Sequence, residues 1–129
     1  MNDETPPFEL RERTKLFGLW IVKMFVALPK TDEAQVLGKQ VLRSGTSVGA
    51  NYREAHRARS KTEFISKIGD CLKEFDETAY CRELLTESGI VPAAKLAPLQ
   101  DETNQLLAIL PTISKNTKNP PAHFIIHPS

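Results

Sequence analysis

Small side chains recur at helical spacing in the stretch SGTSVGANYREAHRARSK, residues 44–61, before the chain becomes basic. Positions three, four, seven and eleven residues after the first share one face of a helix. That face is narrow, so a neighbouring helix can approach it closely. Its residues are Ser44, Ser47, Val48, Asn51 and Ala55, with Tyr52 continuing the apolar side. The stretch therefore predicts a helix whose first role is close packing.

Asn51 places a polar amide on this otherwise apolar face. A buried amide that lacks a partner is costly, so we expect Asn51 to hydrogen-bond to a neighbouring helix and to fix the register of packing. Contact with a ligand is the alternative interpretation.

Composition indicates one compact domain with a nearly balanced charge. The chain has 129 residues, of which 40% are hydrophobic and 26% are charged. Its 17 basic and 16 acidic side chains leave a formal charge of +1, which excludes a protein that binds phosphate backbones through overall charge. Any nucleic-acid site must therefore be local.

Neither a membrane span nor a disulfide is expected. The apolar run of residues 17–28 contains Lys23 and is shorter than the ~20 residues that a span requires. The first residues are acidic and proline-containing, unlike a secretory signal, so we expect a cytoplasmic protein that makes no membrane contact. Cys71 and Cys81 lie about 15 Å apart on one expected helix and should be free thiols.

Four helices are predicted. The first covers about residues 8–28 after a short lead that ends at Pro6 and Pro7. The second runs from about Asp32 to Ala58 without a break, although a local break near residues 44–47 is the alternative. Apolar residues recur with helical spacing in the first helix and are expected to form its buried face. They are Leu16, Leu19, Trp20, Phe25, Val26 and the aliphatic stem of Lys23.

The third helix begins at a capping box, Ser60 to Glu63, and should end before Gly89. Its expected buried stripe is Phe64, Ile65, Ile68, Cys71, Leu72, Phe75, Ala79, Leu84 and Leu85. The fourth starts near Pro92, and Pro111 should stop or kink it. Short turns between these helices predict an all-α, antiparallel up-down-up-down four-helix bundle over residues 1–114, followed by an irregular tail over residues 115–129.

Several segments together resemble a known bacterial family. They are residues 43–55, Ser60-Lys61, Phe64-Ile65, Lys67-Ile68-Gly69, Lys73-Glu74 and Asp76-Glu77-Thr78. The chain resembles the bacterial four-helix-bundle proteins encoded in intervening sequences of large-subunit ribosomal RNA genes. It is also similar to the accessory variability determinant of diversity-generating retroelements, a basic pentamer that binds nucleic acid. The resemblance implies a homopentamer without catalytic activity.

Basic residues gather where the second expected helix ends. Arg53, Arg57 and Lys61 are spaced four residues apart, Arg59 lies between them and Arg43 precedes them. We interpret these five residues as a site for RNA or DNA. Alternatively, they stabilise the negative end of the helix dipole and pair with acidic residues of the third helix. A third interpretation is that they bind an acidic protein partner.

Other candidate sites are weaker. Asp70, Glu74 and Glu77 share a helical face, but the pattern of di-iron bundles, Glu-x-x-His, is missing. We expect these carboxylates to pair with lysines and with the basic cluster. His123 and His127 have no third ligand, and His56 has no nucleophile beside it. The sequence therefore predicts a non-catalytic, homo-oligomeric assembly protein without a metal or cofactor. A purely structural or protein-interaction module is the alternative.

Overall fold

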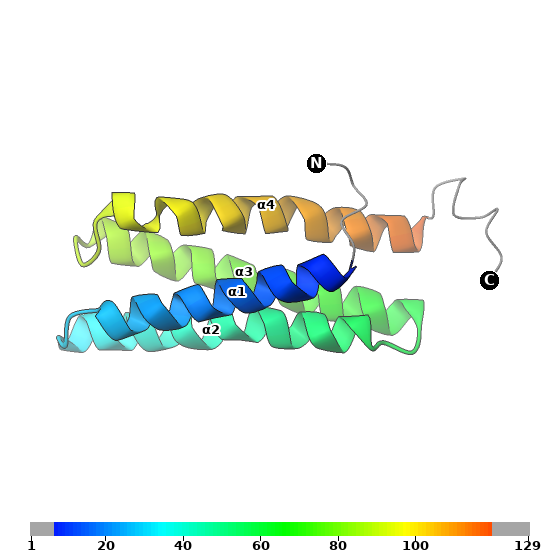
Figure 1. Cartoon of the computed structure of the whole chain (residues 1–129), viewed down its shortest axis with the longest axis horizontal. Coiled ribbons are helices and arrows are strands. Elements are labelled where there is room, and N and C mark those ends of the chain that lie inside the picture. Colours follow the sequence, from blue (N-terminus) through cyan, green and yellow to red (C-terminus); the bar gives the residue numbers. More distant parts are fainter. Residues whose placement is uncertain (1–6, 120–129) are drawn as a thin grey trace.

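The computed structural model describes residues 7–119, which fold into four helices. They are α1 (Pro7–Ala27), α2 (Asp32–His56), α3 (Lys61–Glu87) and α4 (Ala93–Lys118). Consecutive helices run in opposite directions and lie side by side (Figure 1). The described residues contain no strand. The all-α, up-down-up-down four-helix bundle is therefore confirmed.

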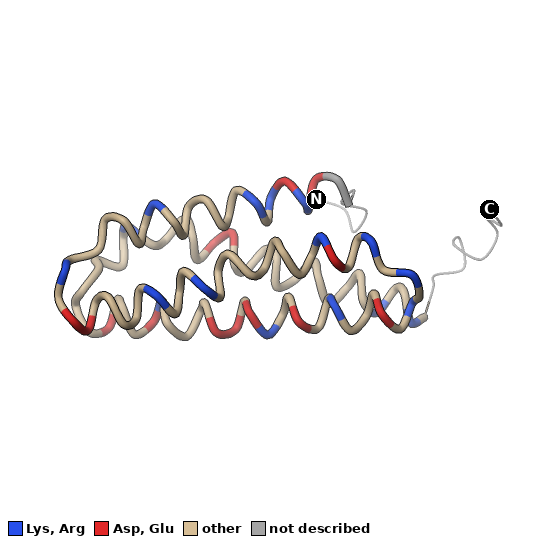
Figure 2. The backbone as a smooth tube through the Cα atoms, turned by 90° about the horizontal axis from the view of Figure 1, so that it is seen from below, with Lys and Arg blue, Asp and Glu red and all other residues tan. Residues whose placement is uncertain are grey.

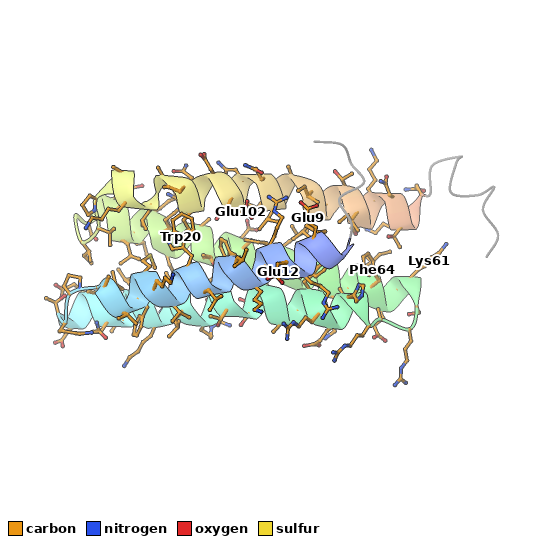
Figure 3. The ribbon with its side chains drawn as sticks, viewed as in Figure 1. Glu9, Glu12, Trp20, Lys61, Phe64 and Glu102 are labelled. Atoms are coloured by element: carbon orange, nitrogen blue, oxygen red, sulfur yellow. The ribbon has the colours of Figure 1, made fainter. Side chains whose placement is uncertain are left out.

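The bundle is open along one side. α1 packs on α2, α2 on α3 and α3 on α4, whereas α1 and α4 scarcely touch. A salt bridge spans this α1–α4 seam, with Arg13 Nη2 lying 2.8 Å from Glu102 Oε1. Figure 3 shows Glu102 on the edge of α4 that faces α1, and Trp20 between the two helices. The seam consequently leaves part of α1 without a covering helix.

Aromatic side chains occupy the centre of the core. The rings of Phe17 and Phe75 meet edge to face with centroids 5.1 Å apart, and Tyr52 is 2% exposed. Such pairs add to the stabilisation that burial itself provides. On α3 the buried residues are Ile68, Cys71, Phe75, Thr78, Cys81 and Leu85, so part of the expected stripe is only half-buried and Thr78 and Cys81 replace it.

The predicted buried face of α1 is wrong in most of its residues. Leu16, Leu19, Lys23 and Val26 are exposed, whereas Trp20 and Phe25 are half-buried and pack against the core. The buried apolar residues of α1 are instead Leu10, Phe17, Ile21 and Met24, followed by Leu28 just after the helix. α1 carries apolar residues around most of its circumference, so helical spacing alone does not select the face that packs.

Glycines of α2 allow close contact with α1, as predicted for an unbroken helix. A Cβ on Gly45 would lie 2.7 Å from Ile21 Cγ1, and one on Gly38 would lie 2.5 Å from Leu28 Cδ1. Because Ile21 and Leu28 fill these positions, any larger residue would require them to shift. These tight contacts offset the loss of helix propensity, which is about 1 kcal/mol per glycine.

The small-residue face of α2 is only partly buried. Ser44, Val48, Tyr52 and Ala55 are buried, whereas Ser47 and Asn51 are half-buried. The expected interhelical hydrogen bond of Asn51 is absent from the described residues. That prediction is wrong because Asn51 lies at the edge of the α2 packing face, where water can satisfy its amide.

Capping residues set the helix ends. Thr31 Oγ1 accepts from the Ala34 amide at 3.4 Å, and Ser60 Oγ accepts from the Glu63 amide at 3.0 Å. Gly89, with φ +80°, follows α3. These three ends match the prediction.

The predicted end of the fourth helix is wrong. α4 continues through Pro111 to Lys118, so the boundary expected at residues 114/115 falls inside a helix. Proline removes one backbone donor, and buried Leu106 and Leu110 hold the flanking turns against the core. The lead before Pro7 and residues 120–129 of the expected tail lie outside the described residues.

Both cysteines are free and buried, as predicted. None of the helices within residues 7–119 combines the length and the hydropathy that a bilayer crossing requires.

Candidate nucleic-acid interface

The structure separates the five basic residues predicted to form one site. Arg53 lies in the last turn of α2, Arg57 caps that helix, and Arg59 lies in the connection to α3. α2 ends at His56, so Lys61 does not continue its stripe but begins α3. In Figure 3, Lys61 points away from the bundle at that end.

Arg43 belongs to a different face of the molecule. Its Nη2 lies 3.2 Å from Glu74 Oε1, and it also binds Glu77. These two carboxylates raise the pKa of Arg43. They therefore hold Arg43 in contacts between α2 and α3, and we exclude it from the candidate interface.

Charge is unevenly distributed over α2 and α3. Figure 2 shows basic positions around the α2–α3 junction and acidic positions repeated along α3. One further pair connects the two helices, with Lys67 Nζ lying 2.6 Å from Glu54 Oε1. The expected pairing of α3 carboxylates with the basic cluster thus holds for Glu74 and Glu77, whose partner is Arg43.

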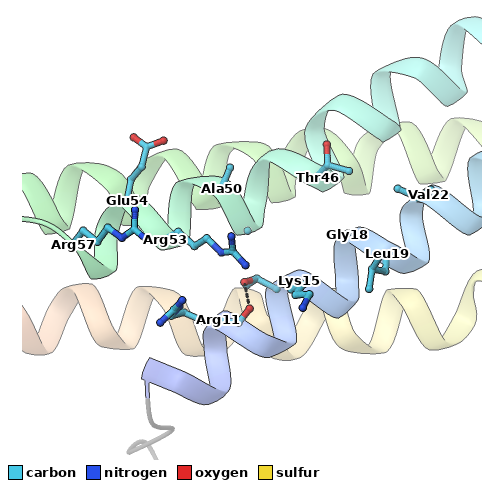
Figure 4. Close-up of a pocket in the computed structure, with 12 residues that line it drawn as sticks. Arg11, Lys15, Gly18, Leu19, Val22, Thr46, Ala50, Arg53, Glu54 and Arg57 are labelled. Carbon is cyan, nitrogen blue, oxygen red and sulfur yellow. Dashed lines mark hydrogen bonds between the residues drawn. The ribbon is translucent and has the colours of Figure 1, made fainter.

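Four basic side chains line one groove between α1 and α2. Arg11 and Lys15 come from α1, and Arg53 and Arg57 come from α2. The groove encloses about 520 Å³ and is open to solvent. In the close-up of Figure 4, Arg53 extends from α2 toward α1, beside Lys15. We call this feature the basic groove.

These cations lack acidic partners. Within residues 7–119, none of Arg11, Lys15, Arg53 and Arg57 lies within salt-bridge distance of a carboxylate. Glu54 is the acidic residue of the lining, and it binds Lys67 and points away from the groove in Figure 4. The basic groove therefore presents uncompensated positive charge to solvent.

Small residues bring the two helices of the groove close together. Gly18, Gly49 and Ala50 are part of its lining. A Cβ on Gly49 would lie 3.4 Å from the Thr14 carbonyl oxygen, so the two helix backbones approach closely there. Leu19 and Val22 line the end away from the arginines. The groove is thus cationic at one end and apolar at the other.

Sequence reasoning identified the α2 half of this groove and missed the α1 half. Arg11 and Lys15 are four residues apart, as are Arg53 and Arg57. Arg11 and Lys15 lie in the first half of α1, and Arg53 and Arg57 lie at the end of α2. An antiparallel helix hairpin makes the start of its first helix a neighbour of the end of its second, and this placement was the available signal.

Groups that could support chemistry are buried or dispersed. Burial raises the pKa of Cys71 to about 12 and that of Tyr52 to about 12, so both side chains are neutral at physiological pH. His56 is exposed. Over residues 7–119, histidine, cysteine and acidic side chains do not gather into a metal-binding group of three. His123 and His127 lie outside the described residues.

Comparison with known proteins places this bundle in a family. No curated protein matches the chain. One solved structure, a protein of unknown function from the S23 ribosomal protein family of Bacteroides thetaiotaomicron, is 33% identical, with a TM-score of 0.79. That match covers 84% of this chain and 97% of the other. Residues 8–112 match the family described as 23S rRNA-intervening sequence protein. The chain therefore belongs to the 23S rRNA-intervening sequence protein family.

Proposed function

We propose that this chain is a non-catalytic, cytoplasmic assembly protein that forms a homo-oligomer and binds RNA or DNA through the basic groove. The observation that carries the proposal is the presence of Arg11, Lys15, Arg53 and Arg57 in one open groove, where none of them pairs with an acidic side chain of residues 7–119. Arginine side chains form paired hydrogen bonds to phosphate oxygens, and released counterions supply much of the binding free energy.

The basic groove suits a phosphate backbone better than a compact anion. Its cations come from two turns of each helix and surround an open channel rather than a closed pocket. Such an arrangement contacts several phosphates at once and reads no base sequence. The described lining of the groove contains no aromatic ring, so phosphate contacts should dominate, and because these carry no sequence information binding should be sequence-tolerant.

The outward side of α1 supplies a surface for self-association. Leu19, Val22 and Val26 are 49%, 39% and 67% exposed, and we call them the outer row. Exposed apolar side chains that cluster on one helix are typical of a protein interface. A pentamer, which family resemblance implies, would repeat the basic groove around a ring and strengthen a weak site through multivalency.

The nucleic-acid clause is tested with matched neutralising variants. Arg11→Gln/Arg53→Gln/Arg57→Gln removes three charges from the basic groove, and Lys30→Gln/Lys39→Gln/Lys73→Gln removes three elsewhere. Fluorescence anisotropy with a labelled single-stranded RNA at several salt concentrations gives affinity and its salt dependence. The groove variant should bind more weakly, with a log–log salt slope smaller by about 2, because each lost phosphate contact lowers it by ~0.7. Equal slopes in the two variants would refute the clause.

The assembly clause has its own measurement. Leu19→Ser/Val26→Ser should lower the mass found by light scattering, whereas Val36→Ser/Tyr80→Ser, which changes exposed apolar residues on α2 and α3, should not. A wild-type mass equal to that of one chain would refute this clause.

A structural or protein-interaction module is the second candidate function. The apolar end of the basic groove, formed by Leu19 and Val22, favours it because a nucleic-acid backbone makes little use of apolar contacts. An amphipathic helix with acidic residues could bind there, with its carboxylates at the cationic end of the groove and its apolar side chains on Leu19 and Val22. Unchanged salt slopes in the variants above, together with copurification of a protein free of nucleic acid, would support this alternative.

A further inference from the structure

The α1–α4 seam contains a groove with a largely apolar α1 wall. Arg13, Leu16, Phe17 and Trp20 line it from α1, and Pro98, Asp101, Glu102 and Gln105 line it from α4, around a hollow of about 370 Å³. Arg13 and Glu102 form a salt bridge across it. We call this hollow the seam groove.

Large apolar side chains of the seam groove remain in contact with water. Leu16 is 55% exposed and Trp20 is half-buried. Leu16 and Trp20 also line the adjoining hollow on α1, together with Leu19 and Lys23, and that lining is almost wholly apolar. Trp20 is therefore the shared wall of a continuous apolar surface, and Figure 3 shows it between α1 and α4.

The chain itself carries an apolar run that follows α4. Residues Phe124, Ile125 and Ile126 are consecutive and stand among polar residues and prolines. They lie beyond residue 112, the last that matches the family, so a role for them would be particular to this chain. Three large apolar residues in succession favour a buried site over an exposed one.

The position of the run along the chain matches the near half of the seam groove. α4 ends at Lys118, at the end of the bundle where α1 begins (Figure 1). Gln105 and Asp101 lie about 20 and 26 Å back along α4 from Lys118, at ~1.5 Å per residue. An extended chain that turns back covers about 20 Å to Phe124 and about 26 Å to Ile126, at ~3.3 Å per residue. The run therefore reaches the level between Gln105 and Asp101 and does not reach the far end of α1.

We propose that the Phe124–Ile126 run folds back along α4 and occupies the seam groove of its own chain, covering Leu16 and the near edge of Trp20. It thereby supplies the apolar cover that α4 does not give to α1. The basic groove stays open when the run is in place, because none of the residues that line it lines the seam groove, although Leu19 of the outer row shares the adjoining hollow with Leu16 and Trp20. The inference therefore stands apart from the proposed nucleic-acid function.

Trp20 reports on this contact directly because it is the one tryptophan of the sequence. The full chain is compared with Phe124→Asp/Ile126→Asp and with the matched variant Ala122→Asp/Ser129→Asp, which adds the same charge to the same segment outside the run. Acrylamide, a neutral quencher, measures access to Trp20. We expect the first variant to raise the quenching constant about twofold and to shift emission to longer wavelength, since the indole loses its apolar cover. The second variant should behave as the full chain does.

Two outcomes of the quenching experiment would overturn the proposal. An equal quenching constant in all three proteins would show that the run does not cover Trp20. A difference that appears only at concentrations where copies associate would assign the groove to the run of a second copy.

A crosslink gives an independent test in the full chain. Gln105→Cys/Phe124→Cys should form a disulfide within one chain under mild oxidation, and Lys73→Cys/Phe124→Cys, which places the first thiol on the exposed side of α3, should not. The native thiols of Cys71 and Cys81 are buried and do not compete. A disulfide between chains, or equal crosslinking in the two variants, would contradict the proposed fold-back.

Discussion

Ser44 Oγ and Thr78 Oγ1 lie 2.8 Å apart inside the bundle and join α2 to α3. Both residues are buried, at 0% and 1% exposure. The Thr78 hydroxyl donates to the Glu74 carbonyl at 2.8 Å, so Ser44 is the donor to Thr78. This bond fills the register-fixing role that the sequence assigned to Asn51.

A double-mutant cycle measures the energy of this bond. Ser44→Ala and Thr78→Val each remove this hydrogen bond. In either variant, the remaining hydroxyl can still donate to a backbone carbonyl of its own helix. The free energies of unfolding should show a coupling of about 1 kcal/mol, typical of a buried neutral hydrogen bond. Additive effects of the two substitutions would show that the contact contributes nothing to pairing of α2 with α3.

The contact of Gly45 with α1 predicts opposite effects for two glycine substitutions. Gly45→Ala would place a Cβ 2.7 Å from Ile21 Cγ1, and we expect a loss of about 1–3 kcal/mol from overpacking. Gly69→Ala meets nothing within 4 Å on α3 and should gain about 0.5–1 kcal/mol from helix propensity. Urea denaturation compares the two. Stabilisation by both substitutions would mean that α1 and α2 can separate at no cost.

Buried Cys71 and Tyr52 predict a loss of stability in alkaline solution. Burial raises the pKa of Cys71 from 9.0 to about 12 and that of Tyr52 from 10.0 to about 12. Above pH 9 the unfolded chain releases protons that the folded chain retains, so the free energy of unfolding falls as pH rises toward 12. The slope is at most about 1.4 kcal/mol per pH unit for each group.

Denaturation at a series of pH values, in the full chain and in Cys71→Ala, separates the two groups. The variant should show a flatter profile from pH 9 upward because it lacks the contribution of Cys71, whereas Cys81, whose pKa burial also raises, and Tyr52 account for the slope that remains. Identical profiles would show that Cys71 becomes accessible to water in the folded state.

Pro111 predicts a simple gain in stability for α4. Pro111→Ala restores the amide that a helix interior uses, and we expect the free energy of unfolding to rise by about 1 kcal/mol or more. Pro98→Ala is the comparison, because Pro98 also lies inside α4, in its second turn, where a restored amide can pair with the carbonyl of Ala94. A loss of stability in Pro111→Ala would indicate that the proline shapes the packing of Leu106 and Leu110.

Helix positions were predictable because each boundary has a local chemical cause. Thr31 and Ser60 begin helices by accepting amide hydrogen bonds, and Gly89 follows the end of one with a positive φ. The fourth helix was predicted too short, since its continuation past Pro111 depends on packing by residues that are distant in sequence.

Two features of the candidate site could not be predicted from local patterns. The outward side of α1 is as apolar as its inward side, so periodicity did not reveal that Leu19 and Val26 are exposed. Sequence spacing assigned Arg43 to the basic cluster. In the fold, Arg43 instead pairs with Glu74 and Glu77 of α3. Interhelical partners of this kind follow from register, which sequence spacing alone did not give.

The open α1–α4 seam affects which helix of the bundle unfolds locally most easily. α1 packs mainly on α2, with Phe17 in contact with Phe75 of α3 and Arg13 bound to Glu102 and Gln105 of α4. A helix with one extensive neighbour can detach as a cooperative unit while its three companions keep their amides protected from exchange with deuterium. Such local unfolding of α1 would begin at the α1–α4 seam, and the amides of α2, α3 and α4 would exchange most slowly.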